Sequence, residues 1–99
     1  MSPSHPGPFF YEHFVEDLNF SISDVAKMLG VSRKQLSEVI NEKASISTEM
    51  AARMEKVFRT EAEVWLKIQM DYDLWHFRKS GKLDHLQKFT RRKAKTPAR

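Results

Sequence analysis

The chain has 99 residues, the size of one compact domain, and its content of 40% hydrophobic and 30% charged residues fits a small globular fold. It contains no cysteine, which excludes disulfides and thiolate metal sites. The formal net charge is +4, and the excess lies near the C-terminus, in Arg91, Arg92, Lys93, Lys95 and Arg99. We interpret this run as a solvated, disordered tail, with loose phosphate binding as the alternative.

The start of the chain is rich in proline. We therefore predict an extended segment over residues 1–8, followed by a first helix from Phe9 to about Leu18. Within that helix Phe10, Phe14 and Leu18 recur at four-residue spacing and are expected to face the core. The start lacks the pattern of a signal peptide, and no apolar run is long enough for a membrane span. A cytoplasmic protein with no membrane contact is expected.

Capping residues predict the next two helices. Ser21 and Asp24 have the spacing of a capping box that opens a short second helix, and Gly30 suits the left-handed conformation that ends it. Residues 32–35 read Ser-x-x-Gln, a second capping box, which opens a third helix that ends near Asn41. The apolar residues expected to point inward from these helices are Val25, Ala26, Leu29, Leu36, Val39 and Ile40.

Two more helices follow. Ser47 is the expected N-cap of a fourth helix, over residues 48–58, and the capping-box pattern at 60–63 opens the longest helix, which runs to about Lys79. The fold class is therefore all-α, with a five-helix, phage-repressor-like helix-turn-helix domain over residues 9–80. Residues 81–99 form a basic C-terminal segment. Its Leu83, Leu86 and Phe89 have helical spacing, and disorder is expected after about residue 89.

The second and third helices, joined through Gly30, Val31 and Ser32, have the spacing of a DNA-binding helix-turn-helix. The alternative is an ordinary helical hairpin with a solvated outer face. The outer residues suited to contact base edges in the major groove are Ser32, Arg33, Lys34, Ser37 and Glu38. Glu38 either accepts a hydrogen bond from cytosine or pairs with Lys34. The residues suited to contact the phosphate backbone are Ser21, Ser23, Asn41 and Lys43.

Four stretches together carry a family resemblance. They are His5-Pro6-Gly7, the pattern S-x-x-x-x-A-x-x-L-G-V-S from Ser21 to Ser32, the third helix ending in Ile40-Asn41, and Glu63-Val64-Trp65-Leu66-Lys67-Ile68-Gln69 followed by Tyr72-Asp73-Leu74. In this combination the chain resembles the HigA-type antitoxins, also known as the virulence-associated protein I family, of the larger Xre/Cro repressor class. The resemblance spans about His5 to Trp75.

This resemblance implies a homodimer that binds double-stranded operator DNA, represses its own toxin–antitoxin operon and neutralises a ribonuclease toxin of the HigB type. By motif match it also implies a backbone contact at Asn41 and base contacts at Ser32, Arg33, Lys34, Ser37 and Glu38. One position departs from the class. Where the class usually has a DNA-contacting Gln, directly after the N-cap of the second helix, this chain has Ile22, which cannot form a hydrogen bond through its side chain.

The predicted long helix is apolar on more than one side, whereas a helix on the surface of a small monomer needs only one apolar stripe. The additional apolar surface has three explanations: it packs against a second subunit, it packs against residues 82–89 folding back, or it lies in the core of the same chain. We expect the dimer or partner contacts at Trp65, Ile68, Gln69, Tyr72 and Trp75. Gln69 and Tyr72 are interpreted first as bonding between helices or across the dimer.

No pattern in the chain indicates catalysis, and neither a metal nor a cofactor is predicted. The histidines His5, His13, His76 and His85 include no pair at the i, i+4 spacing of two helical metal ligands. Two alternatives to the antitoxin stay open at this point. One is a stand-alone Xre-class repressor, and the other is a helical protein-interaction module with little DNA binding.

Overall fold

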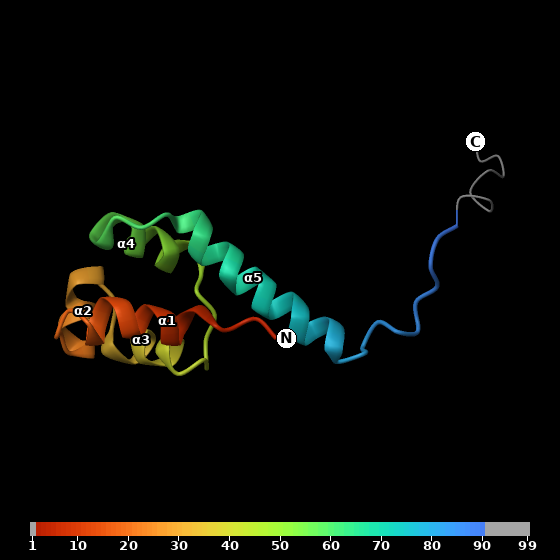
Figure 1. The fold of residues 1–99 in the computed structure, drawn as a ribbon, viewed down its shortest axis with the longest axis horizontal. Coiled ribbons are helices and arrows are strands. Elements are labelled where there is room, and N and C mark those ends of the chain that lie inside the picture. Colours follow the sequence, from red (N-terminus) through yellow and green to blue (C-terminus); the bar gives the residue numbers. More distant parts are fainter. Residues whose placement is uncertain (1, 91–99) are drawn as a thin grey trace.

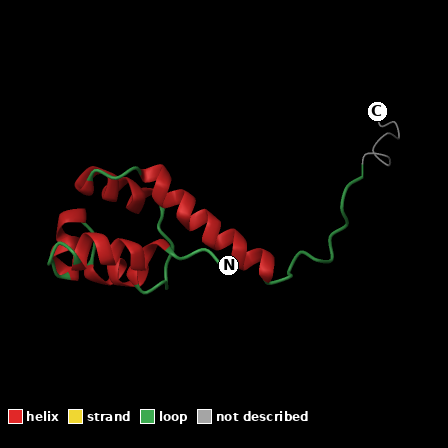
Figure 2. Ribbon diagram, in the orientation of Figure 1, coloured by secondary structure: helices red, strands yellow, loops and turns green. Residues whose placement is uncertain are grey.

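The computed structural model describes residues 2–90, and in them every regular element is helical (Figure 2). The elements are α1 (Pro6–Tyr11), η1 (Glu12–Glu16), α2 (Ile22–Leu29), α3 (Arg33–Ile40), α4 (Thr48–Phe58) and α5 (Ala62–Lys79). The π-helical turn η1 continues α1 directly, so the described part of the chain contains five helices. The predicted all-α class and five-helix count are confirmed.

The helices form a small body from which the second half of α5 projects (Figure 1). Helix α3 packs on both α1 and α2, α4 packs on α2 and α5, and α5 also contacts α1. The core lies where these helices meet, and its largest fully buried apolar side chains are Phe10, Leu36, Met54, Val15 and Val25. No helix within residues 2–90 has both the length and the apolar character that crossing a membrane requires.

The first helix begins earlier than predicted, at Pro6 rather than Phe9. The expectation that all of residues 1–8 are extended is therefore wrong for the last three of them. Proline fits the first turn of a helix, because the N–H that it lacks would have no partner there. His5 is the N-cap, and its Nδ1 accepts a hydrogen bond from the Gly7 N–H at 2.9 Å.

The four-residue spacing predicted for the first helix is wrong at the C-terminal end of that helix. In η1 the backbone bonds span five residues, as in the bond from the Asp17 N–H to the Glu12 carbonyl at 2.9 Å. The wider turn brings Val15 into the core with Phe10 and leaves Leu18 exposed, so Leu18 is not the core residue expected from four-residue spacing.

Three of the four predicted helix starts have the capping bonds expected of them. The Ser21 and Ser32 hydroxyls each accept the third N–H of their helix at 3.0 Å, and the Asp24 and Gln35 side chains complete the two capping boxes. The Ser47 hydroxyl accepts the Met50 N–H, also at 3.0 Å.

The predicted capping box at residues 60–63 is wrong. The N-cap of α5 is Glu61, with no bond from its side chain. The Thr60 hydroxyl instead accepts the indole N–H of Trp65 at 2.6 Å. The Glu55 carboxylate of α4 accepts the N–H of Ala62 at 3.1 Å, so a neighbouring helix supplies the bond that a local cap would have made.

Helix α5 ends at Lys79, as predicted, and the chain then turns through Ser80 and Gly81. Residues 82–90 form no further helix and lead away from the body (Figure 1). They do not fold back onto α5 in this structure. The disorder expected after about residue 89 falls almost entirely on residues 91–99, outside the described part of the chain.

Candidate DNA-binding interface

The turn between α2 and α3 is set by one backbone conformation. Gly30 is left-handed, with φ 72° and ψ 30°, and ends α2 as predicted. Its N–H and that of Val31 bond to the last turn of α2, the latter to the Ala26 carbonyl at 3.0 Å. An L side chain rarely adopts this conformation, and glycine adopts it without a steric penalty. The turn thus fixes where α3 starts and in which direction it leaves.

Helix α3 is held to the core by one face. Leu36, Val39 and Ile40 are buried, as the sequence predicts, and Val31 is half-buried beside them. On the other side Ser32, Arg33 and Lys34 are exposed, and Ser37 and Glu38 are half-buried. The structure therefore brings the proposed base-contacting residues together at one accessible surface of α3. Whether they contact DNA stays a prediction.

The two basic residues at the start of α3 form no ion pair with any acidic residue of the described part of the chain. Within residues 2–90 the ion pairs are His13 with Asp17, Arg53 with Glu49 and Lys67 with Asp71. Lys34 and Glu38 are therefore not paired with each other, although pairing was one interpretation of Glu38. The positive charges of Arg33 and Lys34 are left available to an anionic or acceptor-rich ligand.

The C-terminal end of α3 is also defined by hydrogen bonds. The Glu38 carbonyl accepts the N–H groups of Lys43 and Ala44 at 2.8 and 3.1 Å. The side-chain amide of Asn41 donates to the Ser37 hydroxyl at 3.2 Å. One proposed backbone-contacting residue therefore orients a proposed base-contacting residue, a link that the sequence analysis did not anticipate. Asn41 and Lys43 are both exposed.

The N-terminal end of α2 combines polar and acidic groups. Ser21 and Ser23 are exposed there, and Ile22 between them is half-buried against the core. The Ser21 backbone N–H donates to the Asp24 carboxylate, and this bond, with the Ser21 side chain and the charge of Lys27, lowers the pKa of Asp24 below its ordinary value. Asp24 stays ionised at neutral pH, so any phosphate bound at this helix end would lie near a carboxylate.

Arg53 of α4 supports the turn and was missed by sequence reasoning. Its guanidinium donates to the Leu29 carbonyl at 2.8 Å and to the Gly30 carbonyl at 3.4 Å. Glu49, one helical turn earlier, holds the guanidinium by two hydrogen bonds, of 3.0 and 2.6 Å. Arg53 therefore supplies donors to the free carbonyls at the end of α2 and connects the helix-turn-helix to α4. No local pattern in the sequence marks a contact between residues so far apart.

A second contact, whose partner could not be identified from the sequence, lies after α3. Buried Gln69 of α5 accepts the N–H of Ile46 at 2.8 Å through its side-chain oxygen and donates to Asp73 at 3.0 Å. Ile46 belongs to the loop between α3 and α4, so the bond joins α5 to the segment that follows the candidate recognition helix. The interpretation that Gln69 bonds between elements is consistent with this contact, which lies within one chain.

The five residues expected at a dimer or partner surface differ in how they are placed. Trp65 and Gln69 are buried within the chain, so their side chains are not available to a partner, contrary to that expectation. Ile68, Tyr72 and Trp75 are half-buried. Tyr72 packs edge-on against His5 with ring centroids 4.9 Å apart, and Lys79 lies over the Trp75 ring at 4.9 Å.

Comparison with known proteins identifies the family. The family model described as "Helix-turn-helix" matches residues 14–65, more than half of the chain. The chain belongs to the Xre-type helix-turn-helix family. The matched residues contain α2, the left-handed turn and α3, so the helix-turn-helix predicted from the caps is confirmed.

Relatives within the family agree with the resemblance found in the sequence. A Haemophilus influenzae protein named as an uncharacterised helix-turn-helix transcriptional regulator is 38% identical over 88% of this chain and 76% of its own length. Virulence-associated protein I of Dichelobacter nodosus is 32% identical over 75% of this chain and 68% of its own. A solved structure of Pseudomonas aeruginosa antitoxin HigA with the higBA promoter is 25% identical, covers 89% of this chain and 99% of that one, and has a TM-score of 0.81.

Proposed function

We propose that this Xre-type protein binds double-stranded operator DNA through α3 and represses its own operon. The observation that carries the proposal is the exposed, unpaired basic pair Arg33 and Lys34 at the N-terminal end of α3. Arginine can form two hydrogen bonds to guanine in the major groove, and lysine forms a looser contact. The similarity to an antitoxin whose structure includes promoter DNA supports the same role for this face.

Serine and glutamate side chains complete the proposed reading surface. Ser32, Ser37 and Glu38 would contact base edges beside the basic pair. The proposed phosphate contacts come from the two ends of the motif, at Ser21, Ser23, Asn41 and Lys43. These phosphate contacts would fix the position of the protein on the duplex and carry no sequence preference. Half-buried Ile22 can add only apolar packing at its position.

We propose that the protein acts as a homodimer. Beyond the core-facing residues, α5 exposes Met70, Leu74 and Phe77, and Met70 is 50% exposed. These three follow one another at spacings of four and three residues, which places them on one side of the helix. A second copy packed along this side would remove the apolar surface from water. It would also give the complex two reading helices for the two half-sites of an operator.

The name of the HigA relative supports an antitoxin role in which the protein also neutralises a ribonuclease toxin of the HigB type. A stand-alone transcriptional repressor is the second candidate, because the Haemophilus relative is named as a transcriptional regulator. The neighbouring genes separate these roles. A small basic open reading frame next to this gene, whose product co-purifies with the protein, supports the antitoxin, and a gene without such a neighbour supports the free-standing repressor.

The test of DNA binding is a band-shift titration with the DNA upstream of the protein's own gene, over a series of salt concentrations. We expect specific binding whose affinity falls as salt rises, because phosphate contacts release bound cations. A shuffled duplex of the same length and composition is the control. Absence of a specific shift even at low salt would contradict the proposal and favour a helical protein-interaction module.

A further inference from the structure

An apolar groove runs between α1 and the first half of α5. It consists of two adjoining hollows of about 380 and 310 Å³ that share Phe9 and Ile68 in their linings. Val64 and Phe14 add apolar surface to the first hollow. Phe9 and Val64 are each 49% exposed, so the groove is a surface that nothing in residues 2–90 covers.

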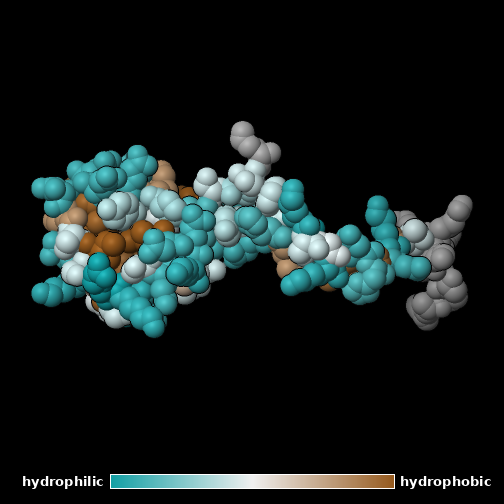
Figure 3. Space-filling model, turned by 90° about the horizontal axis from the view of Figure 1, so that it is seen from below, coloured by the Kyte–Doolittle hydropathy of each residue, from teal (hydrophilic) through white to brown (hydrophobic). Residues whose placement is uncertain are grey.

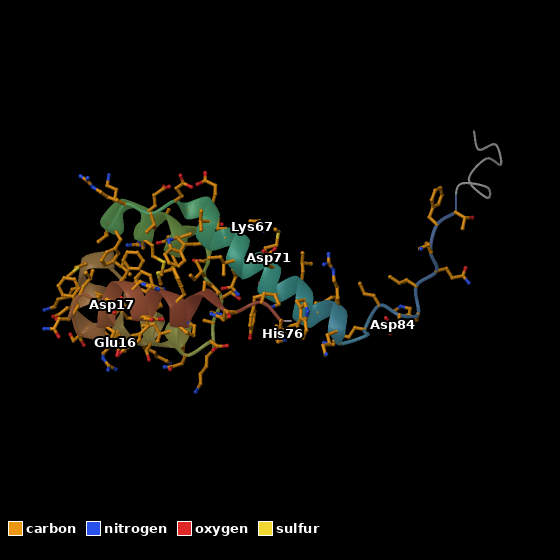
Figure 4. The ribbon with its side chains drawn as sticks, in the orientation of Figure 1. Glu16, Asp17, Lys67, Asp71, His76 and Asp84 are labelled. Carbon is orange, nitrogen blue, oxygen red and sulfur yellow. The ribbon has the colours of Figure 1, made fainter. Side chains whose placement is uncertain are left out.

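Acidic side chains lie at the edge of this groove. Glu61 lines the first hollow, and Glu12 lines a neighbouring hollow that shares Phe9 with the groove. Neither carboxylate forms an ion pair within residues 2–90. Asp71, which lines the second hollow, is already paired with Lys67 at 2.8 Å, and Figure 4 shows both on α5. A segment that fills the groove would therefore gain from apolar side chains flanked by positive charge.

The segment after α5 has this chemistry. Leu83, Leu86 and Phe89 are 53%, 61% and 74% exposed. Basic side chains alternate with them, at Lys82, His85 and Lys88, and the sequence continues with Arg91, Arg92 and Lys93. Figures 3 and 4 show the segment leading away from the helical body, with Asp84 near its start. Exposing three large apolar side chains to water is unfavourable in free energy, and burying them in a groove would remove this cost.

We propose that the groove is occupied by residues 83–89 of a second copy of the chain, so that the two copies exchange C-terminal arms. The inference rests on the proposed homodimer and adds which surfaces meet. Leu86 and Phe89 would contact Phe9 and Val64, and the basic residues of the arm would lie near Glu12 and Glu61.

The course of the arm favours a second copy over the same one, because residues 82–90 lead away from the groove of their own chain (Figure 1). Val64 and Lys79 are separated by about 22 Å of helix, at 1.5 Å per residue. The chain from Lys79 to Leu86 spans at most about 24 Å when fully extended. Its own Leu86 would reach the level of Val64 only with no length left for reversing direction. Its own Phe89 has about 10 Å more, but reaching Val64 would undo the turn in which the Leu86 N–H bonds to the Leu83 carbonyl at 3.0 Å. An arm from an antiparallel partner approaches the groove without this constraint.

A disulfide test is well suited to this protein because the chain has no cysteine of its own. The full-length variant with Val64→Cys and Leu86→Cys is oxidised and run on a non-reducing gel. The matched control carries Val57→Cys and Leu86→Cys, since Val57 is a valine of α4 that is 37% exposed, lines neither hollow and lies outside the proposed dimer surface of α5. We expect covalent dimers from the first variant at a rate at least about tenfold above the control, because a disulfide requires Cα atoms closer than about 7 Å.

Light scattering on the unmodified protein separates this inference from the proposed homodimer. If the protein is a dimer but the Val64 variant crosslinks no faster than the control, or only within one chain, the arm exchange is wrong and the proposed homodimer is unaffected. A protein that is monomeric at every concentration overturns both. In a second measurement, Leu86→Ser should raise the dimer dissociation constant by about tenfold, while Gln87→Ser, at an exposed arm position to which the proposal gives no contact, should change it much less. Equal effects of the two substitutions would also contradict the inference.

Discussion

Gly7 of α1 meets the backbone carbonyl of Val39 in α3 so closely that a Cβ atom on Gly7 would overlap the carbonyl oxygen. The start of α1 therefore lies directly against the end of the candidate recognition helix. His5, buried beside it, caps α1 and packs against Tyr72 of α5. The His-Pro-Gly sequence thus has a structural role, because it joins three helices at one point.

Gly7→Ala should lower the free energy of unfolding by about 1–3 kcal/mol, the usual cost of forcing an extra group into a packed interior. Pro8→Ala, at the exposed position next to it, is the control and should have a smaller effect. Urea unfolding monitored by circular dichroism measures both. Equal stability of the Gly7 variant and the unmodified protein would show that α1 can move away from Val39 without cost.

Arg33→Ala should weaken operator binding by about 1–3 kcal/mol and relax the preference at one base pair. Lys43→Ala should instead weaken binding to all sequences alike and lower the salt dependence by about one cation, as expected for a phosphate contact. Band shifts against a set of single-base operator variants distinguish the two patterns. An Arg33 variant that keeps the full base preference would remove this residue from the proposed reading surface.

Gln69→Leu should destabilise the fold by about 1–3 kcal/mol, because it leaves the buried Ile46 N–H without an acceptor. Gln69→Glu keeps an acceptor oxygen at the same place and should retain more of the stability at neutral pH. Amide hydrogen exchange at Ile46 is the direct measurement. Unchanged protection of that N–H in the leucine variant would argue against the bond.

Asp24→Asn should reduce stability at neutral pH, and the difference from the unmodified protein should shrink in acid. Because folding lowers the pKa of Asp24, its ionised form stabilises the folded state above the ordinary pKa of 3.8. That contribution is lost as the pH falls through the lowered pKa of the folded state. Denaturation midpoints measured between pH 7 and pH 2.5 test the trend, and a stability difference that does not change with pH would contradict it.

The helix starts that could be predicted from sequence are those whose bonds are local. Ser21 and Ser32 each bond to a residue three positions away, so the pattern that predicts the cap contains both partners. The helix-turn-helix and its exposed residues followed from these caps and from the glycine between them. The predicted cap at Thr60 failed because Glu55 of the preceding helix supplies the bond, and the predicted burial of Leu18 failed because the π-helical turn changes the register of the helix.

The contacts that stabilise the interface were not predictable in the same way. Arg53 bonds to carbonyls 24 and 23 residues earlier, and Gln69 bonds to an N–H 23 residues earlier. Arg53 belongs to no local motif, and for Gln69 the sequence indicated a bond between elements but not its partner, because each pairing depends on how α4 and α5 pack on the rest of the body. Sequence patterns predicted which residues lie on the surface of α3, and tertiary packing determined what holds that surface in place.

The bond between Gln69 and Ile46 has a consequence for operator selection. Because it connects α5 to the segment directly after α3, the recognition helix is attached to the proposed dimer helix by a short, buried link. In a homodimer built on α5, the two recognition helices would keep a nearly constant separation. Such a protein would discriminate between operators by the spacing of their half-sites as well as by their bases, and a few inserted base pairs would place one half-site out of reach.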